Sequence, residues 1–361
     1  DWGIPVPLEN AQGKVIYGWF DAPIGYISAT KVWAQEQGTP EAWKQWWQDE
    51  GTEYLAFIGK DNIVFHTLIF PAMLMAKGGY ILPANVPANE FLNLEGEKFS
   101  KSRNWAIDLQ DYLRDFPEDQ HVDALRYALA MVFPETRDAD FTWKDFQARV
   151  NNELASKLGN FINRSLQFMP KNFDGMVPFL PEKYAKLPDA WNLLYNDVCR
   201  MDDLDAEALC DEIAPKYLHY FSKEDIRLII ALIQGGRTIA AKYKAFRFRD
   251  AVTETMNLAQ AANKYFNDAA PWKSLKEKPE ECARTMFICA QAVRSLGVAF
   301  APILPYTSRK ILDMVQAVEG AESWKTIGLP LVPAGTPIAI PDRLFAHISD
   351  EAIQEQIAKL G

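Results

Sequence analysis

Positively charged and hydroxyl side chains crowd a short stretch that follows a glycine turn. In EGEKFSKSRNW, residues 95–105, Lys98, Lys101 and Arg103 lie around Ser100 and Ser102. Lysine ammonium groups and exposed backbone N–H groups stabilise the negative charge that builds on a polyphosphate as it reacts. The stretch therefore predicts a phosphate-binding loop, and the alternative is a solvated surface loop.

The elements before this loop predict a parallel α/β sheet. KVIYGWF (14–20), EYLAFIG (53–59) and NEFLNLEG (89–96) have the composition and boundaries of buried strands. Helical stretches over 25–37, 41–49 and 60–79 separate them. Alternating strands and helices favour parallel strands, which bind ligands at their carboxyl ends. The predicted phosphate loop follows the last of these ends.

The chain beyond Arg103 has a helical pattern. Asp108 is expected to cap a helix over 109–115, and Thr142 with Asp145 forms a capping box. Further helices are expected over 122–132, 151–169, 226–248, 250–267, 280–300 and near 350–360. The second half is therefore predicted to be an α-helical bundle.

The helix expected over 151–169 has two distinct faces. One face is apolar and the other is polar, which is typical of a helix that packs on a bundle. The apolar face holds Leu154, Leu158, Phe161, Ile162 and Leu166, and the polar face holds Asn160, Asn163, Arg164 and Gln167.

Composition excludes several classes of protein. The 361 residues carry a formal charge of −10, which argues against broad binding to DNA or other nucleic acid. Two acid-free basic stretches, 154–173 and 235–249, are either solvated helix faces or local RNA contacts. No apolar run approaches the length of a membrane span. The four cysteines contain no C-x-x-C pair, so we expect reduced core residues in a cytoplasmic protein and no metal site.

Four segments resemble one enzyme family. KFSKS (98–102) resembles the KMSKS signature of class I aminoacyl-tRNA synthetases, with Phe99 in place of the usual methionine. YGWFDAPIGY (17–26) and FIGKDNIVFH (57–66) resemble segments of methionyl-tRNA synthetases. NFINR (160–164) and APW (270–272) resemble the anticodon-reading elements of that family. The resemblance covers nearly the whole chain and implies a methionine–tRNA ligase, whose partners are methionine, ATP with Mg²⁺ and tRNA(Met).

Two family features do not occur in this sequence, namely the HIGH motif and the zinc knuckle of the connective insertion. The resemblance thus implies a C-terminal portion of the family, with zinc expected only in the absent insertion. Its parts would be the second half of a Rossmann-like nucleotide-binding domain (1–95), a KMSKS-loop and stem-contact region (96–150), an anticodon-binding helical bundle (151–323) and a C-terminal extension (324–361). Since half of the phosphate site is absent, we expect this portion alone to form no adenylate.

The resemblance also implies an ATP site. Lys101 would act most directly on the phosphates with Lys98 in support, and Ser100 would shape the loop. Gly59 and Asp61 match positions that hold adenosine, although Asp61 also suits the N-cap of the following helix. Phe99 is expected to anchor the loop by packing.

The same resemblance implies a methionine pocket and an anticodon site. Sulfur packs well on aromatic rings, and bases in loops are read by stacking and by hydrogen bonds to their edges. The pocket would comprise Trp19, Ala22, Pro23, Tyr26 and His66, and the CAU anticodon would meet Asn160, Arg164 and Trp272. Without the resemblance, His66 would be a core histidine and Trp272 a buried plug between helices.

Three other functions stay open from the residues alone. One is a synthetase of the same class for another apolar amino acid. The second is a non-catalytic fragment that only holds tRNA. The third is a nucleotide-binding protein whose bundle contacts other proteins.

Overall fold

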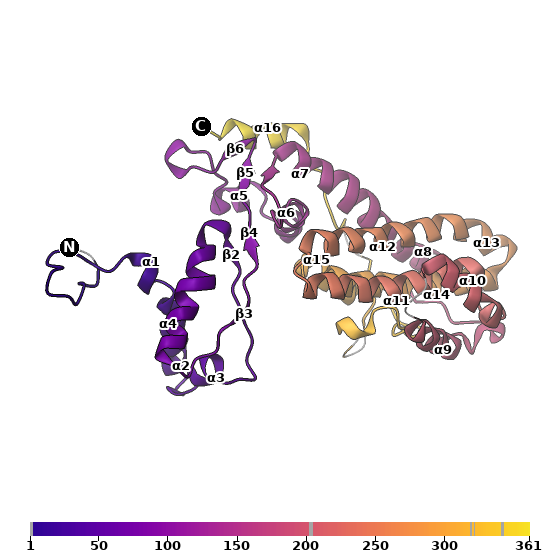
Figure 1. Cartoon of the computed structure of the whole chain (residues 1–361). Coiled ribbons are helices and arrows are strands. Elements are labelled where there is room, and N and C mark those ends of the chain that lie inside the picture. Colours follow the sequence, from indigo (N-terminus) through magenta and orange to yellow (C-terminus); the bar gives the residue numbers. More distant parts are fainter. Residues whose placement is uncertain (1–2, 202–204, 318–319, 321, 341–342) are drawn as a thin grey trace. The chain divides into compact units, whose positions relative to one another are not determined.

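The computed structural model describes residues 3–201, 205–317, 320, 322–340 and 343–361 (Figure 1). The chain divides into two compact units. The first comprises Asp1–Leu92 with Pro134–Ala139, and the second comprises Asn93–Phe133 with Asp140–Gly361. Among the described residues, no helix is both long and apolar enough to cross a membrane.

Short parallel strands form two pairs in the first unit. β1 (Tyr54–Leu55) pairs with β3 (Pro83–Asn85), and β2 (Ile58–Gly59) pairs with β4 (Ala88–Asn89). The connection after β2 is helical, through η1 (Lys60–Asn62), η2 (Phe65–Ile69) and α4 (Phe70–Lys77). The predicted parallel arrangement with a helical crossover is confirmed, and Gly59 ends its strand at the carboxyl edge.

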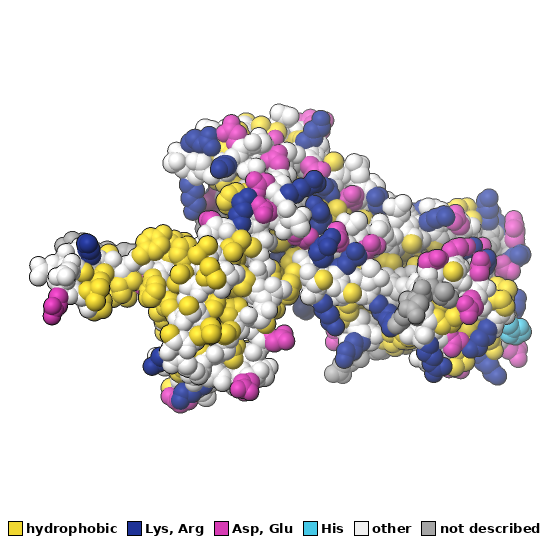
Figure 2. Space-filling view, in the orientation of Figure 1, with side chains coloured by type: hydrophobic (Ala, Val, Ile, Leu, Met, Phe, Trp, Pro, Cys, Tyr) yellow, Lys and Arg dark blue, Asp and Glu magenta, His cyan; other side chains and the backbone are white. Residues whose placement is uncertain are grey.

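Aromatic packing holds the helices of the first unit together. α2 (Ile24–Glu36) and α3 (Lys44–Trp47) pack with α4 around Trp43, Trp47 and Phe70. The Trp47 indole N–H donates to Thr30 Oγ1 at 2.9 Å, which satisfies its one polar atom. Many other large apolar side chains of this unit are exposed, and Figure 2 shows them gathered on one face.

The predicted strand over 14–20 is wrong. Val15 forms only an isolated bridge with Pro5, and α1 (Gly18–Asp21) is a short helix. Local hydrogen bonds from Phe20 N to Tyr17 O and from Ala22 N to Gly18 O satisfy the backbone here. The apolar composition of the segment reflects exposed aromatic side chains and not a buried strand.

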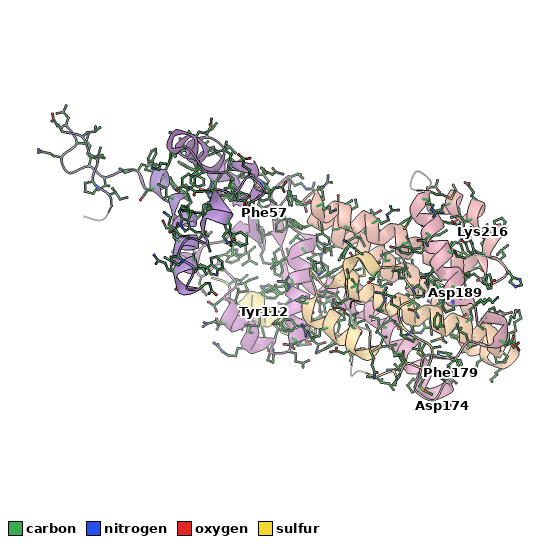
Figure 3. All side chains as sticks on the ribbon, turned by 90° about the horizontal axis from the view of Figure 1, so that it is seen from below. Phe57, Tyr112, Asp174, Phe179, Asp189 and Lys216 are labelled. Carbon is green, nitrogen blue, oxygen red and sulfur yellow. The ribbon has the colours of Figure 1, made fainter. Side chains whose placement is uncertain are left out.

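A three-stranded sheet in the order β6-β5-β7 precedes the bundle. β5 (Leu92–Leu94) is antiparallel to β6 (Glu97–Lys98), and β7 is Ala139–Phe141. The predicted strand over 89–96 is therefore divided between β4 and β5. Tyr112, labelled in Figure 3, is buried with Phe116, Trp143 and Phe146 beside this sheet.

The helices that follow the sheet begin at the expected caps. Asp108 accepts hydrogen bonds from two backbone N–H groups at the start of α5 (Leu109–Asp115), as predicted. Thr142 caps α7 (Trp143–Arg149), but the Asp145 carboxylate contacts Arg149 at 2.6 Å. Only the threonine half of the predicted capping box is therefore formed. Between these helices lies α6 (Asp119–Met131).

The rest of the second unit is a helical bundle, as predicted (Figure 1). The apolar face expected within 151–169 is buried along η4 (Val150–Gly159) and α8 (Asn160–Asn172). α14 (Pro279–Phe300) is buried along most of its length. The other helices of the bundle are α9 (Leu187–Arg200), α10 (Ala206–Tyr217), α11 (Lys223–Lys244), α12 (Phe248–Ala269), α13 (Pro271–Glu277) and α15 (Pro305–Met314), with 3₁₀ turns η5 (Glu182–Tyr184) and η6 (Trp324–Thr326). The last helix, α16 (Asp350–Ala358), packs on α7, and the 3₁₀ turn η3 (Lys101–Arg103) follows β6.

The four cysteines are unpaired, as predicted. Cys210, Cys282 and Cys289 are buried in the bundle and Cys199 is partly buried. Burial raises the pKa of the Cys282 thiol, which keeps it protonated and unreactive at neutral pH.

A buried ion pair joins three helices of the bundle. Arg284 Nε lies 2.9 Å from Asp225 Oδ2, and the Tyr265 hydroxyl donates to Asp225 Oδ1 at 2.6 Å. Burial raises the pKa of Asp225, while the positive charge of Arg284 opposes that shift. The carboxylate thus depends on its partners to remain charged inside the bundle.

We expect Arg284→Met to lower the free energy of unfolding of the bundle by about 3–5 kcal/mol, because it leaves a buried carboxylate without its counter-ion. Urea unfolding followed by circular dichroism measures this change. Arg227→Met is the matched control, since the Arg227–Glu207 pair is exposed and such pairs contribute about 0–1 kcal/mol. Equal losses in the two variants would contradict the prediction.

Candidate functional site

Tyr26 and His66 form a hydrogen-bonded pair in the first unit. The Tyr26 hydroxyl lies 3.0 Å from His66 Nε2, and His66 Nδ1 lies 3.0 Å from the backbone carbonyl of Asn62. A carbonyl only accepts, so Nδ1 is the donor to Asn62, and Nε2 is then placed to accept from the Tyr26 hydroxyl. His66 is 2% exposed, whereas Tyr26 is 45% exposed. The buried imidazole therefore fixes a tyrosine ring that solvent can reach.

Other predicted pocket residues lie beside this pair. The Trp19 ring stacks on Phe65 at 5.3 Å between centroids, and Phe65 directly precedes His66 in η2. η2 is a π-helix, a local widening that is frequent at functional sites. Pro23 is buried at the start of α2, and Ala22 beside it is exposed. η2 thus brings Trp19 and Tyr26 to one region of the first unit.

Gly59 and Asp61 form a tight turn at the carboxyl end of β2. A Cβ atom on Gly59 would lie 2.9 Å from Asp61 Oδ1, so a larger residue would displace the carboxylate. Asp61 lies within η1, whose N-cap is Gly59, and no side chain caps this turn. The alternative role of Asp61 as an N-cap is therefore wrong. Its exposed carboxylate makes no hydrogen bond or ion pair with the described residues.

The predicted phosphate loop is a small closed loop in the second unit. Ser100 and Trp105 exchange two backbone hydrogen bonds at 2.8 Å, and η3 forms the tip between them. The Ser100 and Ser102 hydroxyl oxygens lie 3.2 Å apart, which suits a role in shaping the loop. Phe99 is 42% exposed, so the expectation that it anchors the loop by packing is wrong.

The cations of this loop differ in their partners. Arg103 NH1 lies 2.8 Å from Glu97 Oε2. Lys101 is exposed and makes no ion pair or hydrogen bond with the described part of the chain. Lys98 is also exposed. A polyphosphate can thus reach Lys101 without displacing a described carboxylate.

The end of the chain holds the base of the loop. Asn104 has a left-handed backbone (φ 53°), and its Nδ2 donates to Lys359 O at 2.9 Å. Lys359 and Gln356 both contact the Asp115 carboxylate, and these hydrogen bonds lower its pKa. The sequence analysis did not assign these residues, since partners 255 positions apart leave no local pattern.

Arg164 lies against two aromatic rings on the bundle. Its guanidinium is 4.8 Å from the ring of Phe266 and 5.5 Å from that of Trp272. The two rings lie 6.0 Å apart, and Arg164 NH1 donates to Asn267 Oδ1 at 2.6 Å. We call Arg164, Phe266, Asn267 and Trp272 the Arg164 platform. Planar bases stack on surfaces of this kind.

Trp272 occupies an exposed position on the platform. It is 43% exposed, so the alternative of a buried plug between helices is wrong. Ala270, in the left-handed region (φ 41°), separates α12 from α13, and the buried Pro271 starts α13. This turn places the indole beside the end of α12.

The amide of Asn160 belongs to the same face, because its Nδ2 lies 3.4 Å from Asn263 Oδ1. The sequence analysis missed Phe266, Asn263 and Asn267. The signal for the two asparagines was their spacing of four residues near a helix end, where asparagine is a poor helix former.

Comparison with known proteins identifies the chain. The profile described as "tRNA synthetases class I (M)" matches residues 1–166, and that described as "Anticodon binding domain of methionyl tRNA ligase" matches residues 219–361. These matches place the chain among the class I aminoacyl-tRNA synthetases. Within that class, it belongs to the methionyl-tRNA synthetase family, and it corresponds to a catalytic portion followed by the anticodon-binding domain.

Individual relatives agree with this placement. The methionine–tRNA ligase of Salinibacter ruber is 45% identical over 99% of this chain, and that of Phocaeicola vulgatus is 46% identical over all of it. The solved structure of Mycobacterium tuberculosis methionyl-tRNA synthetase in complex with methionyl-adenylate is similar with a TM-score of 0.71, at 25% identity over 96% of this chain. The chain spans 48%, 46% and 58% of these three proteins, or about half the length of the curated relatives.

We expect Trp272→Ala to change the free energy of unfolding of the bundle by less than about 1 kcal/mol, because an exposed ring loses little packing. Trp191→Ala is the control, since Trp191 is fully buried and donates to Gly328 O at 2.7 Å. That variant should lose about 3–5 kcal/mol. Urea titration of both variants tests this. A comparable loss of unfolding free energy in the Trp272 variant would show that the ring is packed in the core.

Proposed function

We propose that the complete protein containing this chain is a methionine–tRNA ligase, with methionine, ATP with Mg²⁺ and tRNA(Met) as its substrates. The observation that carries the proposal is the presence of two features on one chain. Lys101 makes no ion pair or hydrogen bond with the described residues, and the Arg164 platform has an exposed ring in Trp272. As a ligase of this kind, the protein would act in the cytoplasm, without a membrane or DNA partner.

The first step would be the activation of methionine. A carboxylate oxygen of methionine attacks the α-phosphorus of ATP, the bond to the β-phosphate oxygen breaks, and pyrophosphate leaves with the added negative charge. Lys101 would stabilise that charge with Lys98 in support, and Ser100 would keep the loop in shape. Mg²⁺ would reach the site with ATP, on the phosphate oxygens.

The Gly59–Asp61 turn suits the adenosine of ATP. The free Asp61 carboxylate can accept hydrogen bonds from both ribose hydroxyls. The absence of a Cβ atom on Gly59 leaves room for that carboxylate.

Methionine would bind among Trp19, Tyr26 and His66, with Ala22 and Pro23 beside them. The Tyr26 hydroxyl proton is directed to His66 Nε2, so the thioether sulfur would meet ring surfaces and not a strong donor. Shape and the polarizable sulfur–aromatic contact would then provide the selectivity over leucine or isoleucine.

In the second step, the methionyl group moves from its adenylate to the terminal adenosine of tRNA(Met), and AMP leaves. The Arg164 platform would select that tRNA by its anticodon CAU. Trp272 would stack on one base, while Asn160 and Arg164 would bind base edges. Asn267 holds the guanidinium through a neutral amide, so Arg164 keeps its full positive charge for RNA.

In the enzyme at the full length of its relatives, Lys101→Ala should reduce the rate of adenylate formation by about 100-fold or more, with methionine affinity nearly unchanged. The lysine acts on charge that develops in the transition state. Stopped-flow measurement of the step gives the rate. Arg103→Ala is the control on the same loop, because Arg103 is paired with Glu97. An unchanged rate in the Lys101 variant would contradict the phosphate role.

Trp272→Ala should weaken the use of tRNA(Met) by about 1–3 kcal/mol in kcat/KM, since one stacking surface is lost. Methionine-dependent ATP–pyrophosphate exchange should stay intact. Tyr306→Ala is the matched control, because Tyr306 is exposed on the bundle to a similar degree, 45% against 43%. If the Trp272 variant discriminates CAU-bearing from altered tRNAs as well as the parent does, the platform does not read the anticodon.

A further inference from the structure

Lys60 lies between Gly59 and Asp61, the two residues proposed to hold adenosine. A lysine at this place suggests a contact with the phosphates of ATP. Its ammonium instead contacts two carboxylates of the first unit, at 2.5 Å from Glu90 Oε2 and 2.8 Å from Asp138 Oδ1. The same nitrogen lies 4.3 Å from the centroid of the Phe91 ring. A lysine has three N–H donors, so two of them are occupied by anions.

The partners of Lys60 lie at chain segments that lead to the second unit. Glu90 and Phe91 come directly before the crossing after Leu92, and Asp138 belongs to the returning segment Pro134–Ala139. Backbone hydrogen bonds join these segments, from Glu90 N to Pro134 O at 2.8 Å and from Ala139 N to Phe91 O at 2.9 Å. Phe91 N also donates to Asp138 Oδ1 at 2.9 Å.

We propose that Lys60 is a positioning residue for ATP, and that it fixes the Gly59–Asp61 turn against the two chain segments through which the first unit continues into the second. This inference rests on the proposed function, and it assigns no phosphate contact to Lys60. The parallel pairing of Gly59 with Asn89 brings the turn beside Glu90. Lys60 also contacts Asp138, so its ammonium joins the Gly59–Asp61 turn to the segment with Glu90 and to the segment with Asp138.

The charge states of the group support this role. Hydrogen bonds from Lys60 lower the pKa of Asp138, and hydrogen bonds to Asp138 and Glu90 raise the pKa of Lys60. Lys60 and Asp138 therefore stay ionised at neutral pH. Without the lysine, two carboxylates would lie close together and repel each other, and the turn would lose its fixed position.

The kinetic test uses the full-length enzyme and methionine-dependent ATP–pyrophosphate exchange. We expect Lys60→Met to raise the KM for ATP about tenfold, to change the KM for methionine less than twofold, and to lower kcat by less than it raises that KM. Lys60→Arg should restore most of the ATP affinity, because a guanidinium can also bridge two carboxylates. Lys44→Met is the control, since the Lys44–Glu41 pair is exposed.

A neutral version of the cluster separates positioning from catalysis. The triple variant K60M/E90Q/D138N removes the repulsion, and the new amide oxygen at position 138 can still accept from Phe91 N–H. It should recover at least half of the ATP affinity that Lys60→Met loses. A lysine that acted on the phosphates would give the opposite result, a kcat reduced about 100-fold in Lys60→Met and in the triple variant alike, and that result would overturn the proposal.

Hydrogen exchange on the 361-residue chain tests the contact without any assay of activity. In Lys60→Met, the amides of Phe91 and Ala139 should exchange at least several-fold faster than in the parent or in Lys44→Met. Unchanged exchange would overturn the proposed bracing even in an active enzyme. If the parent enzyme lacks methionine-dependent exchange, the proposed function fails, while the hydrogen-exchange result still decides whether Lys60 holds these segments.

Discussion

A lysine that meets a polyphosphate has to stay unpaired, in a chain whose formal charge is −10. Nearby carboxylates are therefore taken by other cations. Glu97 contacts Arg103, and Asp115 contacts Lys359. The loop is held at its base by Asn104 and Trp105, and Lys101 at its tip has no counter-ion among the described residues. The β6-β5-β7 sheet, helix α5 and the end of the chain at Lys359 all contribute to keeping Lys101 away from the described carboxylates.

The bundle meets a similar requirement with neutral partners. Asn267 and the two rings orient Arg164, yet none of them neutralises its charge. A carboxylate at the same place would hold the side chain as firmly and would compete with RNA phosphates. Arg284, inside the bundle, does have a carboxylate partner in Asp225. The two arginines thus differ in the charge of their partners, a neutral amide for Arg164 and a carboxylate for Arg284.

The sequence predicted those parts of the fold that depend on local pattern. The apolar face within 151–169, the Asp108 cap and the helical crossover between parallel strands all follow from patterns of neighbouring residues. The strand predicted over 14–20 does not form, because aromatic side chains favour a strand only when a neighbouring strand covers them. The contacts that complete the candidate sites, such as Asn104 with Lys359 and Arg164 with Asn267, join residues more than 100 positions apart. They could be found only from the folded chain.

Lys60 and Lys101 show why residue type alone does not assign a role. Both lie in glycine- or serine-containing turns that resemble nucleotide-binding motifs. One ammonium contacts two carboxylates and an aromatic ring, and the other contacts none of the described carboxylates. Moving Lys60 onto a phosphate would expose two anions to the same phosphate, which supports the bracing role proposed for it. Of these two lysines, only Lys101 would offer ATP, under the proposed function, a new ion pair without the loss of a pair to a described carboxylate.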